Sequence, residues 1–462
     1  MSNSKALRSG IGYTLGNVLI KGVNFLTLPI FSRLLSPEEF GVYNVFASYD
    51  LILFVVLGLA LHASIQSANL EYRGKINSYT SSISLIYILS GLVACGVAVL
   101  FRNQLGALLG LPPAALTLLV LSSFSGAVIT LYNTRISLDY AYKKYLLVSA
   151  CSSLLNIALS LVLMLTVFDG NRLMGRIIGA SIPTFLISLV LLIGFFRRAK
   201  PQFSKTYWKF GLQYSLPIVP QGISQMLLNQ CDRIMIRSMV SSAAAGIYSL
   251  AGNIKLVLVI ITDSVTTAWT TWFYSQMDKG EKNAIQKRAT QLLMLFFVLT
   301  AGLMALSPEL VQLLGGAKYD RSKYVAVPLV LDAFALFLYN LAVPAQYYAK
   351  KTTYIMYGTM AAAVVNIVLN YIFIQRFGYI AAAYTTLASY LLFAAVHYII
   401  SGTLLKFFVV PVGKMLGICT AVGLLAAWNL LTVNSILLRW GVCAVVVIPT
   451  AFGLLKQMRQ GR

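Results

Sequence analysis

The sequence predicts an all-α integral membrane protein. Three observations carry this prediction: the composition, the length of the apolar runs, and the distribution of the few charged residues. Of the 462 residues, 58% are hydrophobic and 11% are charged, and the mean hydropathy is +0.79. An ordinary soluble domain has about 25% charged residues and about 45–50% apolar ones. The composition therefore excludes a soluble enzyme or a soluble regulator.

The apolar runs predict about fourteen membrane-spanning helices. A helix needs about 20 apolar residues to cross the hydrocarbon core of a bilayer. The runs are long and continuous, whereas the strands of a membrane barrel alternate over about ten residues. In chain order, we expect spans at 11–33, 41–61, 80–101, 115–137, 146–168, 173–196, 211–236, 244–266, 289–308, 325–349, 354–375, 379–402, 415–432 and 436–455.

The basic residues predict the orientation of these spans. The chain has 36 Lys and Arg against 13 Asp and Glu, for a net charge of +23. With the N-terminus in the cytoplasm, 23 basic residues fall on the cytoplasmic side, 11 on the opposite side and two in mid-span. Because Lys and Arg are enriched in cytoplasmic loops, we expect both termini inside and the chain in the cell inner membrane. A nucleic-acid partner is not expected, since the basic residues lie between apolar runs.

Short loops and scattered cysteines argue against an enzyme. The connections between expected spans do not much exceed about 20 residues, which leaves no room for an extramembrane catalytic domain, and no phosphate-binding loop is present. The five cysteines lie in apolar stretches without a CxxC pair, and the chain has two histidines. We therefore expect no catalytic residues, no disulfide framework and no metal site.

An internal repeat divides the chain. The segments RLLSPEEFGVYNVFAS (33–48) and RSMVSSAAAGIYSLAGN (237–253) match when Gly41 is placed on Gly246 and Tyr43 on Tyr248, an offset of 205 residues. The same offset places Asn24 on Asn229 and Asp50 on Lys255. At offsets of 207 and 210, YKK (142–144) and NIALSLVL (156–163) align with AKK (349–351) and NIVLNYIF (366–373). Six spans per repeat give a parallel pseudo-two-fold relation between two lobes.

The repeat sets the expected domains. Residues 1–198 form an N-terminal lobe of six spans, 199–210 a cytoplasmic interfacial linker, 211–405 a C-terminal lobe of six spans, and 406–462 an additional helix pair with a basic tail. We expect Tyr207 and Trp208 of the linker to lie at the lipid headgroups. Pro217 and Pro220 favour a bend early in the seventh span.

The motifs at the first and seventh spans resemble those of a known family. The exit of the first span, RLLSPEEFGVY (33–43), and the end of the seventh, DRIMI (232–236), are followed by NI-centred fifth and eleventh spans. They resemble the Wzx-type polysaccharide-biosynthesis flippases of the multidrug/oligosaccharidyl-lipid/polysaccharide (MOP) superfamily. The resemblance covers roughly residues 5–402. It implies an undecaprenyl-pyrophosphate-linked oligosaccharide as substrate, in a bilayer, with polysaccharide polymerase or chain-length machinery as further partners.

Three charged residues are expected near the middle of spans, namely Lys21, Asp50 and Lys255. Because a charge at the bilayer centre is costly, each is a functional candidate. One interpretation is an ion pair between Asp50 and a lysine that locks the lobes together. The other is a cationic cavity in which Lys21 and Lys255 meet phosphates or acidic sugars while Asp50 holds one lysine in place. Asn24 and Asn229 are the repeat-related polar residues of this candidate cavity.

A second group of charges is expected near the ends of spans. The outer group is Arg33, Asp232, Arg233, Arg237 and Asp332, and the inner pair is Arg135 and Asp263. Each alone is explained by snorkelling to the interface, but together they are candidates for gates that open and close through ion pairs. No organic cofactor is expected. Asp50 and Asp263 are candidate sites for coupling to H⁺ or Na⁺.

The sequence thus favours a secondary-type flippase for a lipid-linked repeat unit of a surface polysaccharide such as O-antigen, capsule or exopolysaccharide, working by alternating access of two lobes. A peptidoglycan lipid-precursor flippase and a MATE-like drug or cation exporter are alternatives of the same general class. Mid-span lysines disfavour the cation exporter, because cation transport favours carboxylates in the cavity. A non-transporting membrane scaffold is the alternative from another class.

Overall fold

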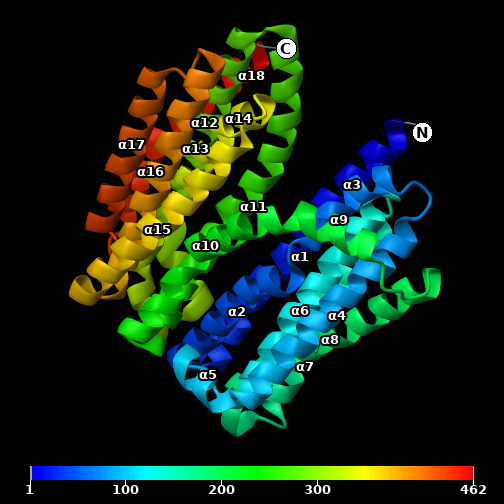
Figure 1. Cartoon of the computed structure of the whole chain (residues 1–462). Coiled ribbons are helices and arrows are strands. Elements are labelled where there is room, and N and C mark those ends of the chain that lie inside the picture. The colour runs from blue at the N-terminus through cyan, green and yellow to red at the C-terminus, as the bar shows by residue number, and fades with distance from the viewer. Residues whose placement is uncertain (1–2, 461–462) are drawn as a thin grey trace. The chain divides into compact units, whose positions relative to one another are not determined.

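The computed structural model describes residues 3–460, and all regular structure in that range is helical. The first part of the chain holds α1 Asn3–Leu34, α2 Pro37–Gly58, η1 Leu61–Ala63, α3 Ser64–Glu71, α4 Ile76–Leu100, α5 Arg102–Leu109, α6 Pro113–Ser137, α7 Tyr142–Leu165, η2 Asp169–Asn171, α8 Arg172–Arg198 and α9 Lys205–Ser215. The remainder holds η3 Leu216–Ile218, α10 Val219–Met239, α11 Ser242–Lys279, α12 Lys282–Gly315, η4 Ala317–Ser322, α13 Lys323–Ala342, α14 Pro344–Tyr348, α15 Thr352–Phe377, α16 Tyr379–Leu405, α17 Val412–Leu431 and α18 Ile436–Gln460 (Figure 1). The predicted all-α membrane fold is confirmed.

Each expected span corresponds to a helix, but the count of fourteen membrane spans is not confirmed. Within residues 3–460, twelve segments are long and apolar enough to cross a membrane, and α1 and α10 are not among them. Polar residues interrupt both helices, such as Lys21 and Asn24 in α1 and Gln230 and Arg233 in α10. These helices therefore have the least apolar composition of the long helices, although they lie where spans one and seven were expected.

The chain forms two compact units, Met1–Ile234 and Met235–Arg462. In the first unit, α4, α6 and α8 lie side by side around a core that includes Ile83, Val128 and Leu192 (Figure 1). In the second unit, α11, α12 and α16 pack against α13, which is buried along most of its length. The boundary between the units falls inside α10, C-terminal to the predicted linker at 199–210. The division into six-helix lobes stays a prediction.

The repeated motifs begin helices α2 and α11 in the same way. Ser36 is the N-cap of α2 and forms a capping box with Glu39, in which Glu39 N donates to Ser36 Oγ (3.1 Å) and Ser36 N donates to Glu39 Oε2 (2.9 Å). Ser241 is the N-cap of α11, and its Oγ accepts from Ala244 N at 3.1 Å. The two caps are 205 residues apart, the same offset as the repeat. The family-like SPEE segment is thus a helix start signal.

The predicted linker is a helix that packs on the first unit. Ser204 caps α9, which contacts α3, η1 and α4 (Figure 1). The Tyr207 ring lies 4.9 Å from that of Tyr72, and Trp208 Nε1 donates to Ser82 O at 3.0 Å. Both rings are half-buried, and the position of Tyr207 and Trp208 at the lipid headgroups stays a prediction. The chain then breaks at η3, where the prolines of the seventh span predicted a bend.

The C-terminal helix pair belongs to the second unit. Helix α17 contacts α12 and α13, and α18 contacts α12. Arg439 of α18 is 2% exposed, and it donates to Ala305 O (2.7 Å) and Val433 O (2.5 Å) and forms an ion pair with Glu309 of α12. A buried guanidinium with three acceptors fixes the angle at which α18 meets α12.

Candidate functional site

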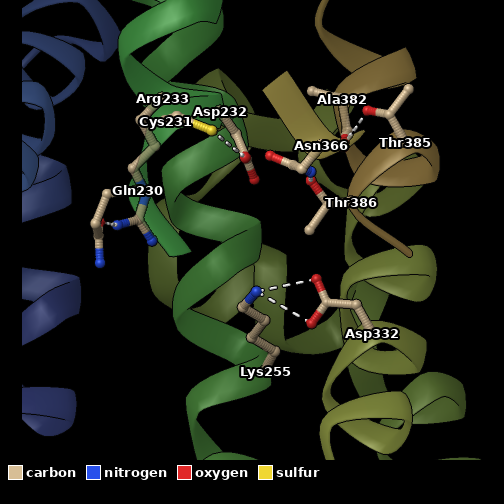
Figure 2. A network of polar contacts seen from close by, with 10 residues as sticks. All are labelled: Gln230, Cys231, Asp232, Arg233, Lys255, Asp332, Asn366, Ala382, Thr385 and Thr386. Carbon is tan, nitrogen blue, oxygen red and sulfur yellow. Dashed lines mark hydrogen bonds and ion pairs between the residues drawn. The ribbon is translucent and has the colours of Figure 1, made fainter. Parts of the chain in front are cut away.

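In the second unit, Lys255 of α11 forms an ion pair with Asp332 of α13 in mid-helix. Lys255 Nζ donates to Asp332 Oδ1 at 3.1 Å and to Oδ2 at 3.0 Å, and the two side chains are 17% and 3% exposed (Figure 2). The expectation that Asp50 holds a lysine is wrong for Lys255, because Asp332 does so. Asp332 was expected in the outer gate and instead faces α11. The lysine therefore has a counter-charge within its own unit, which offsets its desolvation.

In the first unit, the half-buried carboxylate of Asp50 is held by two hydroxyl groups of α6. Ser123 Oγ donates to Oδ1 at 2.7 Å and Ser122 Oγ donates to Oδ2 at 3.0 Å. No described residue forms an ion pair with Asp50. This carboxylate has neutral donors alone, whereas Asp332 has a cation.

These two contacts occupy the same positions of the repeat. Asp50 and Lys255 are 205 residues apart, and Ser122 and Asp332 are 210 apart, as are the first residues of α6 and α13. Each contact joins the second long helix of its repeat to the fourth. The polar mid-helix contact is therefore common to both units, while its charge differs: a carboxylate with hydroxyls in one and an ammonium with a carboxylate in the other.

The other predicted cavity residues are placed on α1 and α10. Lys21 and Asn24 are exposed on α1, and Asn24 Oδ1 accepts from Ser153 Oγ of α7 at 2.8 Å. Asn229 is half-buried, and its Nδ2 donates to Gln225 O at 2.8 Å, one turn back along α10.

The predicted outer-gate residues lie at the ends of α1 and α10. Arg33 is exposed, whereas Asp232 is 3% exposed and its Oδ1 lies 3.7 Å from Cys231 Sγ. Arg233 Nη1 donates to Gln230 Oε1 at 2.6 Å (Figure 2). That oxygen also accepts from Ser48 Oγ of α2 at 3.1 Å. A separate contact joins Arg237 Nε to Ser242 Oγ at 3.2 Å. Their action as a gate stays a prediction.

The two inner-gate candidates have different surroundings. Arg135 is 6% exposed at the end of α6, where Nη1 donates to Asp139 Oδ2 and Nη2 donates to Asn77 Oδ1, each at 2.9 Å. Asp263 is exposed on α11. Arg135 is therefore fixed to the turn that follows α6 and to the start of α4.

Arg176 of α8 was not among the predicted site residues and was expected only as a basic residue of the outer side. This guanidinium points into the first unit, where Nη1 donates to Asn156 Oδ1 and Ser160 Oγ of α7, each at 2.7 Å. The available signal was the position of Arg176 one turn inside the span rather than at its end. The repeat supplied a second signal, since NI-centred segments begin at Asn156 and Asn366.

No group of three or more His, Cys, Asp or Glu side chains able to hold a metal ion occurs in the described part of the chain. A groove of about 650 Å³ between α7 and α8 is lined by apolar side chains, among them Leu155 and Val190. Such a groove suits acyl chains and offers no polar partner to a sugar or phosphate.

A family model described as polysaccharide biosynthesis protein matches residues 6–277, more than half of the chain. The chain belongs to the polysaccharide biosynthesis protein family. Among named relatives, a probable low-salt glycan biosynthesis flippase, Agl15 of Haloferax volcanii, is 21% identical over 472 residues, which cover 97% of this chain and 96% of that protein. This family member is therefore a multi-pass membrane protein whose relatives include a flippase.

Solved structures share the fold of this family member. Lipid II flippase MurJ, in an inward closed conformation, superposes with a TM-score of 0.79 at 15% identity, over 97% of this chain and 99% of that chain. An inward-facing multidrug resistance MATE family transporter of the MOP superfamily superposes with a TM-score of 0.66 at 14% identity, over 82% and 94% of the two chains. The chain thus has the fold of MOP-superfamily transporters, as the motifs predicted.

Proposed function

We propose that this protein is a flippase that moves a lipid-linked oligosaccharide repeat unit, carried on undecaprenyl pyrophosphate, across the cytoplasmic membrane during surface polysaccharide assembly. It acts without enzymatic chemistry, by alternating access of its two lobes, and delivers the repeat unit to polymerase and chain-length machinery. Both termini lie in the cytoplasm. Membership of the polysaccharide biosynthesis family supports the substrate class.

The observation that carries this proposal is the ion pair between Lys255 and Asp332 in mid-helix. A diphosphate headgroup needs a cation along its path, and a cation that has lost its water needs a counter-charge when the substrate is absent. Asp332 supplies that counter-charge at rest. During transport, the substrate phosphate takes the place of Asp332, so that the lysine is never without an anion. The exposed Lys21 supplies a second cation along α1.

We also propose that Asp50 couples transport to H⁺ or Na⁺. Its carboxylate is held by two serine hydroxyls and by no described cation, which leaves its negative charge available to an incoming ion. Asp263, exposed on α11, is the second candidate. Replacing Asp50 with Asn is expected to retain binding of the repeat unit but to remove the dependence of its translocation on the H⁺ or Na⁺ gradient.

Deletion of the gene tests the function. Undecaprenyl-linked repeat units are expected to accumulate on the cytoplasmic face, and a plasmid copy of the full chain is expected to clear them. The amount of lipid-linked intermediates is measured after their extraction. Their side of the membrane is measured from their cleavage by a hydrolase added to the outside of spheroplasts. Normal export in the deletion strain, without accumulation, contradicts the proposal.

A peptidoglycan-precursor flippase is the second candidate, and the TM-score of 0.79 with Lipid II flippase MurJ favours the same architecture for it. This candidate predicts that the chain restores growth to cells depleted of their own lipid II flippase. A drug exporter predicts increased resistance to organic cations when the chain is overproduced. Under our proposal, neither effect occurs.

A further inference from the structure

Arg176 lies in a binding environment within the first unit. Its guanidinium carbon is 3.9 Å from the ring centroid of Phe31 in α1 and 4.5 Å from that of Tyr43 in α2. Its Nη1 group uses both of its hydrogens, since it donates to Asn156 Oδ1 and to Ser160 Oγ of α7. Two aromatic rings and two fixed hydrogen bonds hold the guanidinium in one orientation.

This cation differs from the other buried cations that the structure describes. Arg135, Lys255 and Arg439 each form an ion pair with a carboxylate. Arg176 forms none, and its Nε, like that of Arg135, is buried without a hydrogen-bond partner in the described part of the chain. Nε belongs to the edge of the guanidinium that binds carboxylate or phosphate with two parallel hydrogen bonds. The Tyr43 side chain is a further, neutral hydrogen-bond partner of this guanidinium, so Nε is the donor that is left for an oxyanion.

Snorkelling does not explain this arrangement. Arg172 lies one turn nearer the end of α8, where it forms an ion pair with Asp169 and donates to Leu34 O. Arg176 turns the other way, toward Asn156, which lies about 14 Å along α7 from the end of that helix. This contact is possible because α7 and α8 pack closely at Gly179, which has no side chain. A Cβ at that position would lie 2.4 Å from Ser160 Cα. Arg172 is thus the interfacial residue, and Arg176 is not.

The second unit shows the same positions without the charge. At an offset of 210, the residues equivalent to Asn156, Ser160 and Arg176 are Asn366, Asn370 and Thr386. There, Asn366 Nδ2 donates to Thr386 Oγ1 at 3.0 Å and Asn370 Nδ2 donates to Asn366 Oδ1 at 3.1 Å (Figure 2 shows the first pair). Neutral side chains suffice for this helix–helix contact. The arginine is therefore not required by the packing of the repeat.

We propose that Arg176, through the unpartnered Nε of its guanidinium, is an oxyanion-binding subsite of the first unit, which takes a phosphate or carboxylate group of the transported molecule. This inference rests on the proposed function and adds to it a second anion site besides Lys255. Phe31 and Tyr43 hold the planar guanidinium in place and partly desolvate it, which strengthens its hydrogen bonds to an oxyanion.

Anion binding to the purified full chain in phosphatidylcholine nanodiscs tests the subsite. The probes are inorganic pyrophosphate and glucuronate, measured separately by titration calorimetry, which distinguishes a diphosphate from a sugar acid. A third arm adds phosphatidylglycerol to the nanodiscs, to detect a bilayer headgroup as competitor. The variants are Arg176→Thr, which copies the second unit, Arg176→Lys, which keeps the charge without the fork, and the control Arg172→Gln.

We expect Arg176→Thr to weaken binding of the preferred probe at least tenfold, Arg176→Lys to weaken it less, and Arg172→Gln to leave it unchanged. Competition by phosphatidylglycerol that disappears in Arg176→Thr assigns the same site to a lipid headgroup and supports the subsite. Equal affinities of wild type and a well-folded Arg176→Thr protein overturn it, as does absence of binding in every arm. Failure of the proposed function is read separately, from the deletion strain, and does not alter this binding result.

Discussion

At the scale of the residue, the chain places few charges in its helices and gives most of them a partner. Lys255 is held by Asp332 and Arg439 by Glu309, whereas Asp50 is held by hydroxyls and Arg176 by amide and hydroxyl oxygens. A buried charge that loses its partner is strongly destabilising, by about 3–5 kcal/mol for the removal of one member of a buried pair. Loss of function in a single variant is therefore ambiguous, and paired variants are needed.

Lys255→Ala alone is expected to lower the amount of protein in the membrane, because it leaves the carboxylate of Asp332 buried without its cation. The double variant Lys255→Ala, Asp332→Asn removes both charges and is expected to restore the protein level. Export is expected to stay below about a tenth of wild type, because the cation for the substrate phosphate is gone. Immunoblots of membranes and lipid-linked intermediates measure the two quantities. Wild-type export by the double variant shows that the pair is structural.

At the scale of the element, small residues and single polar contacts decide how helices meet. Helices α7 and α8 approach closely at Gly175 and Gly179, where a Cβ would lie 3.1 Å from Met164 N and 2.4 Å from Ser160 Cα, respectively. In a membrane, such close backbone contact is a main source of helix association. The same approach brings Arg176 within reach of α7. Packing and the candidate anion site are thus linked through one pair of glycines.

Gly179→Leu is expected to separate α7 from α8 and to lower the melting temperature of the purified protein, since backbone atoms of Ser160 cannot move aside as a flexible side chain would. Gly194→Leu on the same helix is the matched control, because no atom lies within 4 Å of its added Cβ. Fluorescence-detected thermal unfolding measures both. Equal melting temperatures for the two variants contradict the proposed packing.

Arg439→Met is expected to loosen α18 from α12, because the carbonyl groups of Ala305 and Val433 lose their donor and Glu309 loses its cation. The expected cost is about 3–5 kcal/mol, as for other broken buried pairs. Lys414→Met, at an exposed position of α17, is the control. Limited proteolysis between α16 and α17 reports the loosening. Identical cleavage rates in both variants argue that apolar contacts alone hold the helix pair.

At the scale of the whole molecule, two units carry related polar contacts with different charges. The pairs Asp50–Ser122 and Lys255–Asp332 occupy equivalent positions, as do Asn156–Arg176 and Asn366–Thr386. A repeat that keeps the position of its polar contacts but changes their charge can bind different groups in each unit. The first unit then offers a carboxylate and an arginine, and the second a lysine with its own counter-ion.

The predicted orientation follows from the loops of both units together. A reporter that is active only outside the cytoplasm is expected to be inactive when fused after Arg462 and active when inserted after Gly316, in the turn between α12 and η4. The excess of basic residues on the cytoplasmic side is the physical reason. An active fusion after Arg462 reverses the orientation and, with it, the side on which the substrate enters.

Much of the fold was predictable because span length and helix capping are local properties. The apolar runs located the long helices, whereas α2 begins at Pro37, after its Ser36 cap, and so before the expected span at 41–61. The wrong predictions concern which charged side chains contact one another. Lys255 was expected near Asp50, and Asp332 in a gate, because a repeat offset relates positions in two lobes but does not state which helices inside one lobe touch.

The sequence by itself determined that this protein is an α-helical membrane protein of the polysaccharide-biosynthesis type, with a repeat and a small number of charges at mid-span. Composition and the length of the apolar runs suffice for the membrane helices, since the bilayer permits few alternatives to continuous apolar helices. The polysaccharide-biosynthesis type was implied instead by the resemblance of the motifs at 33–43 and 232–236. Tertiary structure alone decided which charges meet. The partners of Lys255 and Arg176 lie 77 and 20 residues away in the chain, on neighbouring helices, and only the packing of those helices selects them.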